Sequence, residues 1–315
     1  MEGRFLHEAA RRWARARPVP LPGSLSESLA RLRPEVRRSL ALFERLRAGR
    51  SFQDEVWSRL RDGSAFAPAG VTVNLGDPRE IEKVFANARR GERVAARDLY
   101  AKLSWISHDE RDPSLRIRFS FGSEDLLEWQ GETRRAPWAD RFAEALFPEC
   151  AAISANGPLV GLVERLAGRR VRFSERIVYS NAPGGGASFH ADLEPRQLGV
   201  VYGQLAGATA WLALPERELA DSVALWARRR GWRPSARRAL RGLDRDRNPK
   251  LARLLDSTPA FTGALAQRGA LLVLRAGDAL LLPSPGPERI AWHSVFALGS
   301  SPSLAHSYAI FARRR

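Results

Sequence analysis

The chain has 315 residues, of which 44 % are apolar and 27 % charged, so it has enough apolar material for one or two folded domains and is not disordered in composition. Basic residues outnumber acidic residues by 51 to 35, which gives a net charge of +16, and 48 of the basic residues are arginines. The single cysteine, Cys150, excludes an internal disulfide framework and a cysteine-ligated zinc or iron–sulfur site.

The positive charge is spread along the chain, with no run of five or six like charges. A basic chain can bind nucleic acid, an anionic membrane or an acidic substrate. The Arg-rich segment 227–253, with Trp226 and Trp232, is the part that would favour nucleic acid. Because the charge is dispersed, nucleic-acid binding is possible but is not the favoured function.

The sequence also predicts where the protein resides. No run of 18 apolar residues is present, so no membrane-spanning helix and no membrane partner are expected. The first residues lack an apolar signal core and include Glu2 and Glu8, which fit poorly with a transit peptide. We therefore expect a cytoplasmic, reducing environment.

The first 65 residues form a predicted N-terminal helical region. Helices are expected over 4–16 and 24–62, separated by a segment containing Pro18, Pro20 and Pro22. The second helix carries one apolar stripe at three- and four-residue steps, formed by Leu25, Leu29, Leu32, Val36, Leu40, Phe43 and Leu46. These helices are expected to serve as scaffold.

Residues 66–169 form a predicted mixed region that flanks the core. A short strand is expected over 71–75, and a helix is expected to begin at Asp77-Pro-Arg-Glu80, which has the pattern of an N-cap, a first-turn proline and an acidic third residue. Residues 115–121 alternate as a strand that places Arg116 and Arg118 on one face. Helices are expected over 138–147 and 158–167.

From residue 170 to 315 the sequence predicts a mainly β core. Eight short strand-like segments are separated by Gly or Pro, which is typical of an antiparallel sandwich or barrel. A helical insertion over 216–258 interrupts them. The segments are 171–173, 176–179, 198–202, 209–214, 270–274, 279–282, 294–298 and 304–311.

Three residues of this core form a candidate metal site. His190 and Asp192 are two positions apart, so on a strand they would share one face. His293 follows a later apolar strand. Two imidazoles and one carboxylate are the facial ligand set of non-haem Fe(II) oxygenases, which leaves the opposite positions open. The trio is therefore a candidate iron site.

The context of these residues resembles a known family. Four stretches carry the likeness: Phe-His-Ala-Asp-Leu-Glu at 189–194, a strand-like run at 201–215, Gly-Asp-Ala-Leu-Leu-Leu-Pro at 277–283 and Ala-Trp-His-Ser-Val at 291–295. In this order they resemble the JmjC and cupin-like Fe(II)/2-oxoglutarate-dependent oxygenases. The resemblance implies a double-stranded β-helix (a jelly roll), Fe(II) held by His190, Asp192 and His293 as metal ligands and catalytic residues, and hydroxylation of a C–H bond with 2-oxoglutarate and O₂.

The co-substrate contacts depart from the family pattern. Many such enzymes hold the far carboxylate of 2-oxoglutarate with a lysine, and Thr209 occupies that position here. A carboxylate prefers a charge-assisted partner, so an arginine is the first expectation. The candidates for co-substrate contact are Arg176, Tyr179, Thr209, His306 and Tyr308. The candidates for substrate contact are Arg116, Arg118, Tyr202 and Gln204.

The resemblance implies a peptide, a protein side chain or an amino-acid-derived metabolite as substrate. Two other functions remain open. One is an iron oxygenase or cupin-type enzyme that does not use 2-oxoglutarate, because the lysine is missing. The other is a non-catalytic, basic cupin-fold protein that binds nucleic acid or protein.

Overall fold

The computed structural model describes residues 2–60, 64–73, 78–107, 109–122, 134–192, 194, 196–229, 240, 249–284, 286 and 289–313. Asp77, Trp232 and most of the Arg-rich segment 227–253 lie outside these residues. Among the described helices, none has the length and apolar character needed to cross a bilayer.

The N-terminal region is helical, as predicted, but the second predicted helix is divided. The helices are α1 (Glu2–Ala14), α2 (Ser26–Arg31), α3 (Arg33–Arg47) and α4 (Phe52–Arg59). Pro34 lies in the first turn of α3, where a proline starts a helix, and α3 ends beside Gly49, whose φ is +84°. The proline-rich break before α2 forms the short strand β1 (Val19–Leu21).

Residues 66–121 form four antiparallel strands: β2 (Phe66–Thr72), β3 (Glu80–Arg90), β4 (Arg93–Trp105) and β5 (Leu115–Phe121). The helix predicted to begin at 77–80 is wrong over its described part, because Glu80 opens β3 instead. β3 and β4 pair along most of their length around a turn at Gly91, whose φ is +61°. This long-range pairing outweighs the local cap-like pattern.

The remaining helices and strands follow in order. The predicted helices at 138–147 and 158–167 are present with small shifts of their ends. These elements are α6 (Ala136–Leu146), η1 (Pro148–Cys150), α7 (Ala151–Ser154), α8 (Gly157–Ala167), β6 (Val171–Ser180), β7 (Gly186–His190), β8 (Gln197–Ala206), β9 (Ala208–Pro215), α9 (Glu216–Arg228), α11 (Pro249–Ser257), α12 (Pro259–Leu265), η3 (Ala266–Ala270), β10 (Leu271–Arg275), β11 (Ala279–Pro283), β12 (Ala291–Leu298) and β13 (Leu304–Ala312).

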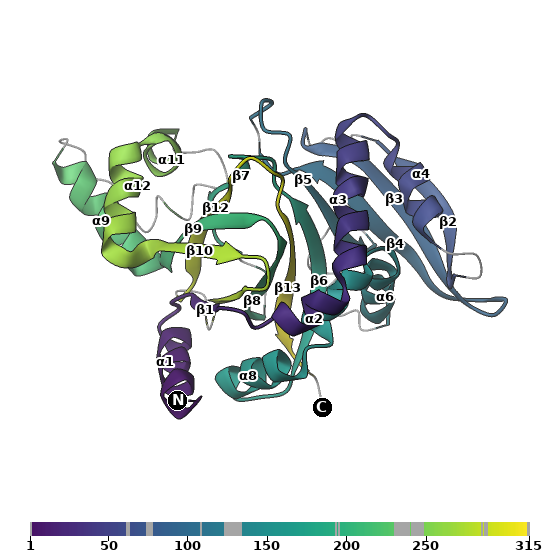
Figure 1. Ribbon diagram of the computed structural model, residues 1–315, viewed down its shortest axis with the longest axis horizontal. Helices are drawn as coiled ribbons and strands as arrows, with labels where there is room; N and C mark the ends of the chain where they lie inside the picture. The colour runs from purple at the N-terminus through teal and green to yellow at the C-terminus, as the bar shows by residue number, and fades with distance from the viewer. Residues whose placement is uncertain are drawn as a thin grey trace.

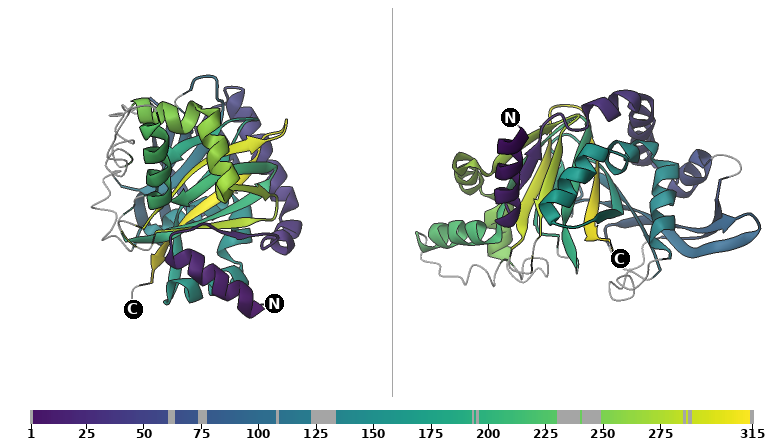
Figure 2. Two further views of the ribbon diagram at one scale, coloured as in Figure 1. Left: turned by 90° about the vertical axis from the view of Figure 1, so that its left-hand side faces the viewer. Right: turned by 90° about the horizontal axis from the view of Figure 1, so that it is seen from below.

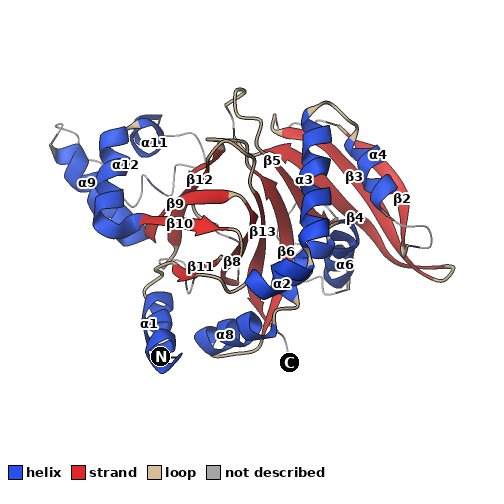
Figure 3. Cartoon of the chain, in the orientation of Figure 1, coloured by secondary structure: helices blue, strands red, loops and turns tan. Residues whose placement is uncertain are grey.

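The strands build two antiparallel sheets (Figures 1 and 3). One has nine strands in the order β1-β11-β8-β13-β6-β5-β4-β3-β2, and the other has four in the order β10-β9-β12-β7. From β6 onward the chain passes from one sheet to the other at each connection except that between β9 and β10, which lie side by side in the four-stranded sheet. The protein is therefore mostly β, and the arrangement is consistent with a jelly roll. The strands of 66–121 extend the nine-stranded sheet rather than forming a sheet of their own.

Three apolar clusters lie between the layers and pack them against one another. The largest packs α3, α4 and α6 against the outer face of the nine-stranded sheet (Figure 1). A second lies between the sheets, around Trp211 and Leu282. A third joins α9, α11 and α12 to the outer face of the four-stranded sheet, beside which these helices lie in Figure 2. The layers therefore run helices, sheet, sheet, helices.

Candidate metal centre

A cavity of about 530 Å³ opens between the two sheets. Residues from both sheets line it, and so does the insertion helix α11, through Ala252 and Asp256. The cavity includes all three predicted metal ligands, His190, Asp192 and His293. It lies at one end of the apolar cluster that fills the space between the sheets.

The two histidines are held as a pair by strand register. His190 on β7 is the partner of His293 on β12, and their ring centroids are 4.2 Å apart. Nδ1 of His190 lies 2.8 Å from the carbonyl oxygen of Ser188, and Nδ1 of His293 lies 3.5 Å from that of Ala291. Contacts of this kind fix which ring nitrogen faces a metal. Nε2 of each ring is left as the ligand atom.

Asp192 completes the group. Its Oδ2 lies 3.9 Å from Nε2 of His293, and one ligand atom from each of the three residues lies within 4.8 Å of the others. Donors bonded to one metal at about 2.1 Å are roughly 3–4 Å apart, so the trio is slightly wider than a bonded set. The structure differs from the prediction in one detail: β7 ends at His190, and Asp192 lies in the loop that follows.

Burial keeps His293 neutral. Its side chain is almost fully enclosed, and burial together with the neighbouring His190 lowers the pKa of His293 to about 4, against a smaller opposing effect of Asp192. A neutral imidazole offers its lone pair to a metal without first losing a proton. His293 is therefore ready to bind a metal at neutral pH.

The position where the resemblance places a lysine is closed off. The Trp211 ring stacks on His293 at 5.4 Å, and its Nε1 donates to Oγ1 of Thr209 at 2.9 Å. Thr209 is fully buried and donates to Gln204, which also receives the hydroxyl of Tyr202. Of this network only Trp211 and Tyr202 line the cavity. The structure therefore places the side chains of Thr209 and Gln204 behind the cavity lining rather than in it.

Three further candidates for co-substrate contact are not among the residues that line the cavity. Arg176, His306 and Tyr308 lie on the face of the nine-stranded sheet that points away from the cavity. Side chains alternate across a strand, so their neighbours Tyr179 and Ser307 line the cavity instead. Arg176 pairs with acidic residues of α6, while His306 and Tyr308 contact Cys150.

Two arginines of β5 line the cavity. Arg116 lies opposite Tyr179 of β6 in register and donates from Nε to the Ser104 hydroxyl at 3.0 Å. Arg118, two residues on, makes an ion pair of 2.8 Å with Glu175. Burial, reinforced by Asp192, raises the pKa of Tyr179 to about 12, so this phenol keeps its proton.

Sequence reasoning missed several lining residues, among them Arg79, Asn181, Glu194 and Asp256. Glu194 follows Asp192 at a spacing of two, which was a usable signal. Burial, Asp192 and Glu175 together raise the pKa of Glu194 to about 7. Asp256 has no local motif, because it reaches the cavity only through the packing of α11 against β7.

Two of the glycines before His190 lie in a tightly packed turn. A Cβ at Gly185 would collide with the Asp112 carboxylate, and one at Gly186 would collide with the backbone carbonyl of Val295. These two glycines let β7 lie close to its neighbours.

We expect Gly186→Ala to destabilise the protein by about 1–3 kcal/mol, the usual effect of overpacking a filled site, and to weaken metal binding, because β7 must shift. Urea unfolding and a metal titration measure the two effects. Gly3→Ala is the control, since a Cβ there meets nothing within 4 Å. Unchanged values for Gly186→Ala would show that this close approach is unimportant.

No protein-family model and no curated protein matches the chain. Solved structures that resemble it include the non-haem α-ketoglutarate-dependent epimerase SnoN from nogalamycin biosynthesis, at 14 % identity and a TM-score of 0.39 over 98 % of this chain and 82 % of that one. They also include an oxidoreductase of the 2OG-Fe(II) oxygenase family from Burkholderia pseudomallei, at 11 % identity and a TM-score of 0.37 over 98 % and 94 %. At these identities and TM-scores, neither structure assigns a function to this chain.

Proposed function

We propose that the protein is an Fe(II)-dependent oxygenase built on a double-stranded β-helix. The strand order supports this fold: β11-β8-β13-β6 and β10-β9-β12-β7 face each other, and the chain crosses between them at every connection from β6 to β13 except β9 to β10. The single observation that carries the function is the convergence of His190, Asp192 and His293 at the cavity.

The donor set fits Fe(II). Two imidazoles and one carboxylate on one side leave the cavity side free for other ligands. Fe(II) bound there would supply O₂ activation. The chain holds Nε2 of both histidines and the Asp192 carboxylate at one point, and Trp211 excludes water behind His293.

The cavity also fits a dicarboxylate co-substrate, and we propose 2-oxoglutarate. Arg116 and Arg118 are the cations that would receive its far carboxylate, with the protonated Tyr179 as a hydrogen-bond donor beside them. The remaining lining from Ser188, Ala252 and Asp256 would face the substrate. We propose hydroxylation of a C–H bond in a peptide, a protein side chain or an amino-acid-derived metabolite.

The test is turnover of the co-substrate. The protein, loaded anaerobically with Fe(II), is mixed with 2-oxoglutarate and O₂, and succinate and O₂ consumption are followed. We expect succinate formation above that of the metal-free protein, and faster formation when a substrate is present. If the protein binds no Fe(II) and forms no succinate, the proposed function is wrong.

Arg116→Met should raise the KM for 2-oxoglutarate by about 10-fold or more, because a hydrogen bond to a charged group contributes roughly 1.5–3 kcal/mol. Steady-state succinate kinetics measure the change. The exposed Arg111→Met is the matched control and should leave KM unaltered. An unchanged KM in Arg116→Met would assign the carboxylate to another cation.

A second candidate is an iron oxygenase that does not use 2-oxoglutarate. The burial of Thr209 behind Trp211 favours it, since the position of the family's lysine is filled. Metal binding together with substrate-dependent O₂ consumption, but without succinate, would identify this function.

A further inference from the structure

The strand that carries His190 lies at the edge of its sheet. Among the strands that the structure describes, β7 pairs with β12 alone, so its other side has no strand partner there. An edge strand is normally the most mobile part of a sheet, because its outward N–H groups are unpaired. A metal site on such a strand needs another source of rigidity.

β7 is also bulged next to His190. Its register with β12 passes from Ala187 opposite Val295 to His190 opposite His293, so two residues of β7 face the single Ser294. A bulge re-aims the side chains that follow it and changes which N–H groups point outward. Gly186, which precedes the bulge, and Phe189, which lies in it, both donate their N–H groups to partners outside the sheet.

Two aspartates from distant parts of the chain receive these N–H groups. Gly186 donates to Oδ2 of Asp112 at 3.0 Å, and Phe189 donates to Oδ1 of Asp256 at 2.9 Å. Asp112 lies on the loop between β4 and β5, and Asp256 lies on α11 of the insertion. The two carboxylates thus hold β7 at its start and beside His190.

Asp112 is itself held in place. Its Oδ1 accepts from the backbone N–H of Ser114 at 3.0 Å and from the Ser114 hydroxyl, and that hydroxyl in turn accepts the N–H of Ala182 at 2.9 Å. Ser114 is fully buried. The carboxylate therefore has a fixed direction, and the glycine turn at 184–186 packs against it.

We infer that Asp112 and Asp256 are positioning residues that fix the edge strand β7 and thereby set the metal affinity of His190 and Asp192. Neither carboxylate is a metal ligand; both act through the backbone of β7. The inference rests on the metal site proposed above. It gives the helical insertion a role in the site, because α11 supplies one of the two carboxylates.

The experiment titrates Co(II) alone into the whole protein and follows the visible absorption bands, which report ligand geometry. Removing a residue that orients metal ligands typically weakens binding 10–100-fold. We expect Asp112→Ala and Asp256→Ala to weaken Co(II) binding at least 10-fold and to alter the bands. Asp256→Asn keeps an oxygen acceptor for Phe189 and should stay within a few-fold of the wild type.

Two exposed aspartates are matched controls: Asp109, on the same loop as Asp112, and Asp221, on α9 of the insertion. Their alanine variants should bind Co(II) as the wild type does. If the wild-type protein binds no Co(II), the proposed function fails. If it binds and Asp256→Ala binds equally well with the same bands, the positioning inference alone fails.

Amide hydrogen exchange of the metal-free wild type tests the same contacts without any variant. We expect the N–H groups of Gly186 and Phe189 to be protected although they point away from the sheet. Exchange as fast as that of unpaired edge amides would overturn the inference even if an alanine variant did not fold.

Discussion

Asp192→Ala and His293→Ala are each expected to abolish Fe(II)-dependent turnover and to reduce metal affinity by at least 100-fold. The facial triad supplies Fe(II) with three protein ligands and leaves its other positions open. Removing one leaves two donors, and the loss of Asp192 also removes the negative charge that offsets the metal. Anaerobic Fe(II) titration and succinate formation measure the two effects.

The matched control is His7→Ala, because His7 is exposed on α1, remote from the cavity. It should bind Fe(II) and turn over as the wild type does. The two ligand variants should also retain cooperative unfolding, since the apolar clusters around the site remain intact. Full activity in either variant would rule out the proposed iron site.

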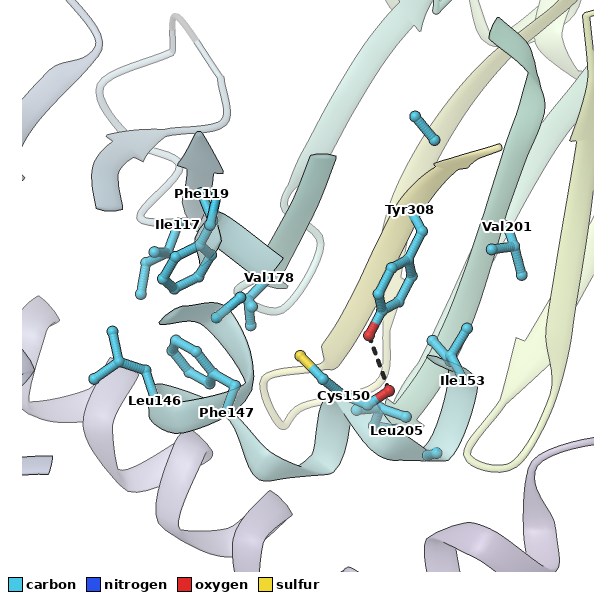
Figure 4. Close-up of a cluster of buried hydrophobic side chains, with 14 of the residues drawn as sticks. Ile117, Phe119, Leu146, Phe147, Cys150, Ile153, Val178, Val201, Leu205 and Tyr308 are labelled. Carbon is cyan, nitrogen blue, oxygen red and sulfur yellow. Dashed lines mark hydrogen bonds between the residues drawn. The ribbon is translucent and has the colours of Figure 1, made fainter. Parts of the chain in front are cut away.

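The second large effect is expected at His306, which is buried on the face of the nine-stranded sheet that points away from the cavity. His306 lies with Nδ1 3.2 Å from the Cys150 sulfur and Nε2 3.5 Å from Glu149, and all three side chains are almost fully buried. Figure 4 shows Cys150 among apolar side chains, with the Tyr308 hydroxyl donating to its backbone carbonyl. Burial on its own would lower the pKa of His306, but Cys150 and Glu149 outweigh it and raise the pKa to about 9.

Glu149→Gln is therefore expected to reduce the free energy of unfolding at pH 7 by about 3 kcal/mol or more, because it leaves a buried imidazolium without its counter-charge. Guanidinium unfolding measures this change. The control is Glu144→Gln on α6, whose carboxylate pairs with Arg176 but is half exposed. If Glu149→Gln were as stable as the wild type, His306 would be neutral in the folded protein.

The same group predicts how stability varies with pH. The folded-state pKa of His306 is raised above its ordinary value of about 6.5. Its contribution is therefore fully present below about pH 6.5 and is lost as the pH rises through about 9. In Glu149→Gln this loss should be smaller, so unfolding curves recorded between pH 6 and 10 separate the two proteins.

Several helices and strands were predictable because their signals are local, whereas the long strands β3 and β4 were not predicted. The alternating pattern at 115–121 predicted a strand, which is β5. The helical run that ends before Gly168 predicted a helix, which is α8. The cap-like pattern at 77–80 failed, because Glu80 belongs to a strand whose pairing with β4 lies more than ten residues away along the chain. The conformational preference of a few neighbouring residues contains no information about a strand partner that is distant in sequence.

The metal candidates were predictable for a different reason. The spacing of His190 and Asp192 and the family-like context of His293 lie in the sequence itself. The co-substrate contacts were not, because choosing among Arg176, Tyr179 and His306 requires knowing which face of a strand looks into the cavity. A shift of one residue along the strand moves a side chain from the cavity face to the opposite face. Asp112 and Asp256 were inaccessible to sequence reasoning, since only the folded chain brings them to β7.

The short strand β1 has a consequence for how the chain avoids self-association. Val19, Pro20 and Leu21 cover the edge of β11, so they close one border of the nine-stranded sheet. An uncovered, apolar edge strand is a template on which a second chain can add its own strand. A protein shortened to begin at residue 25 would present β11 bare, and we expect it to aggregate at concentrations where the full chain stays dispersed, as light scattering would show.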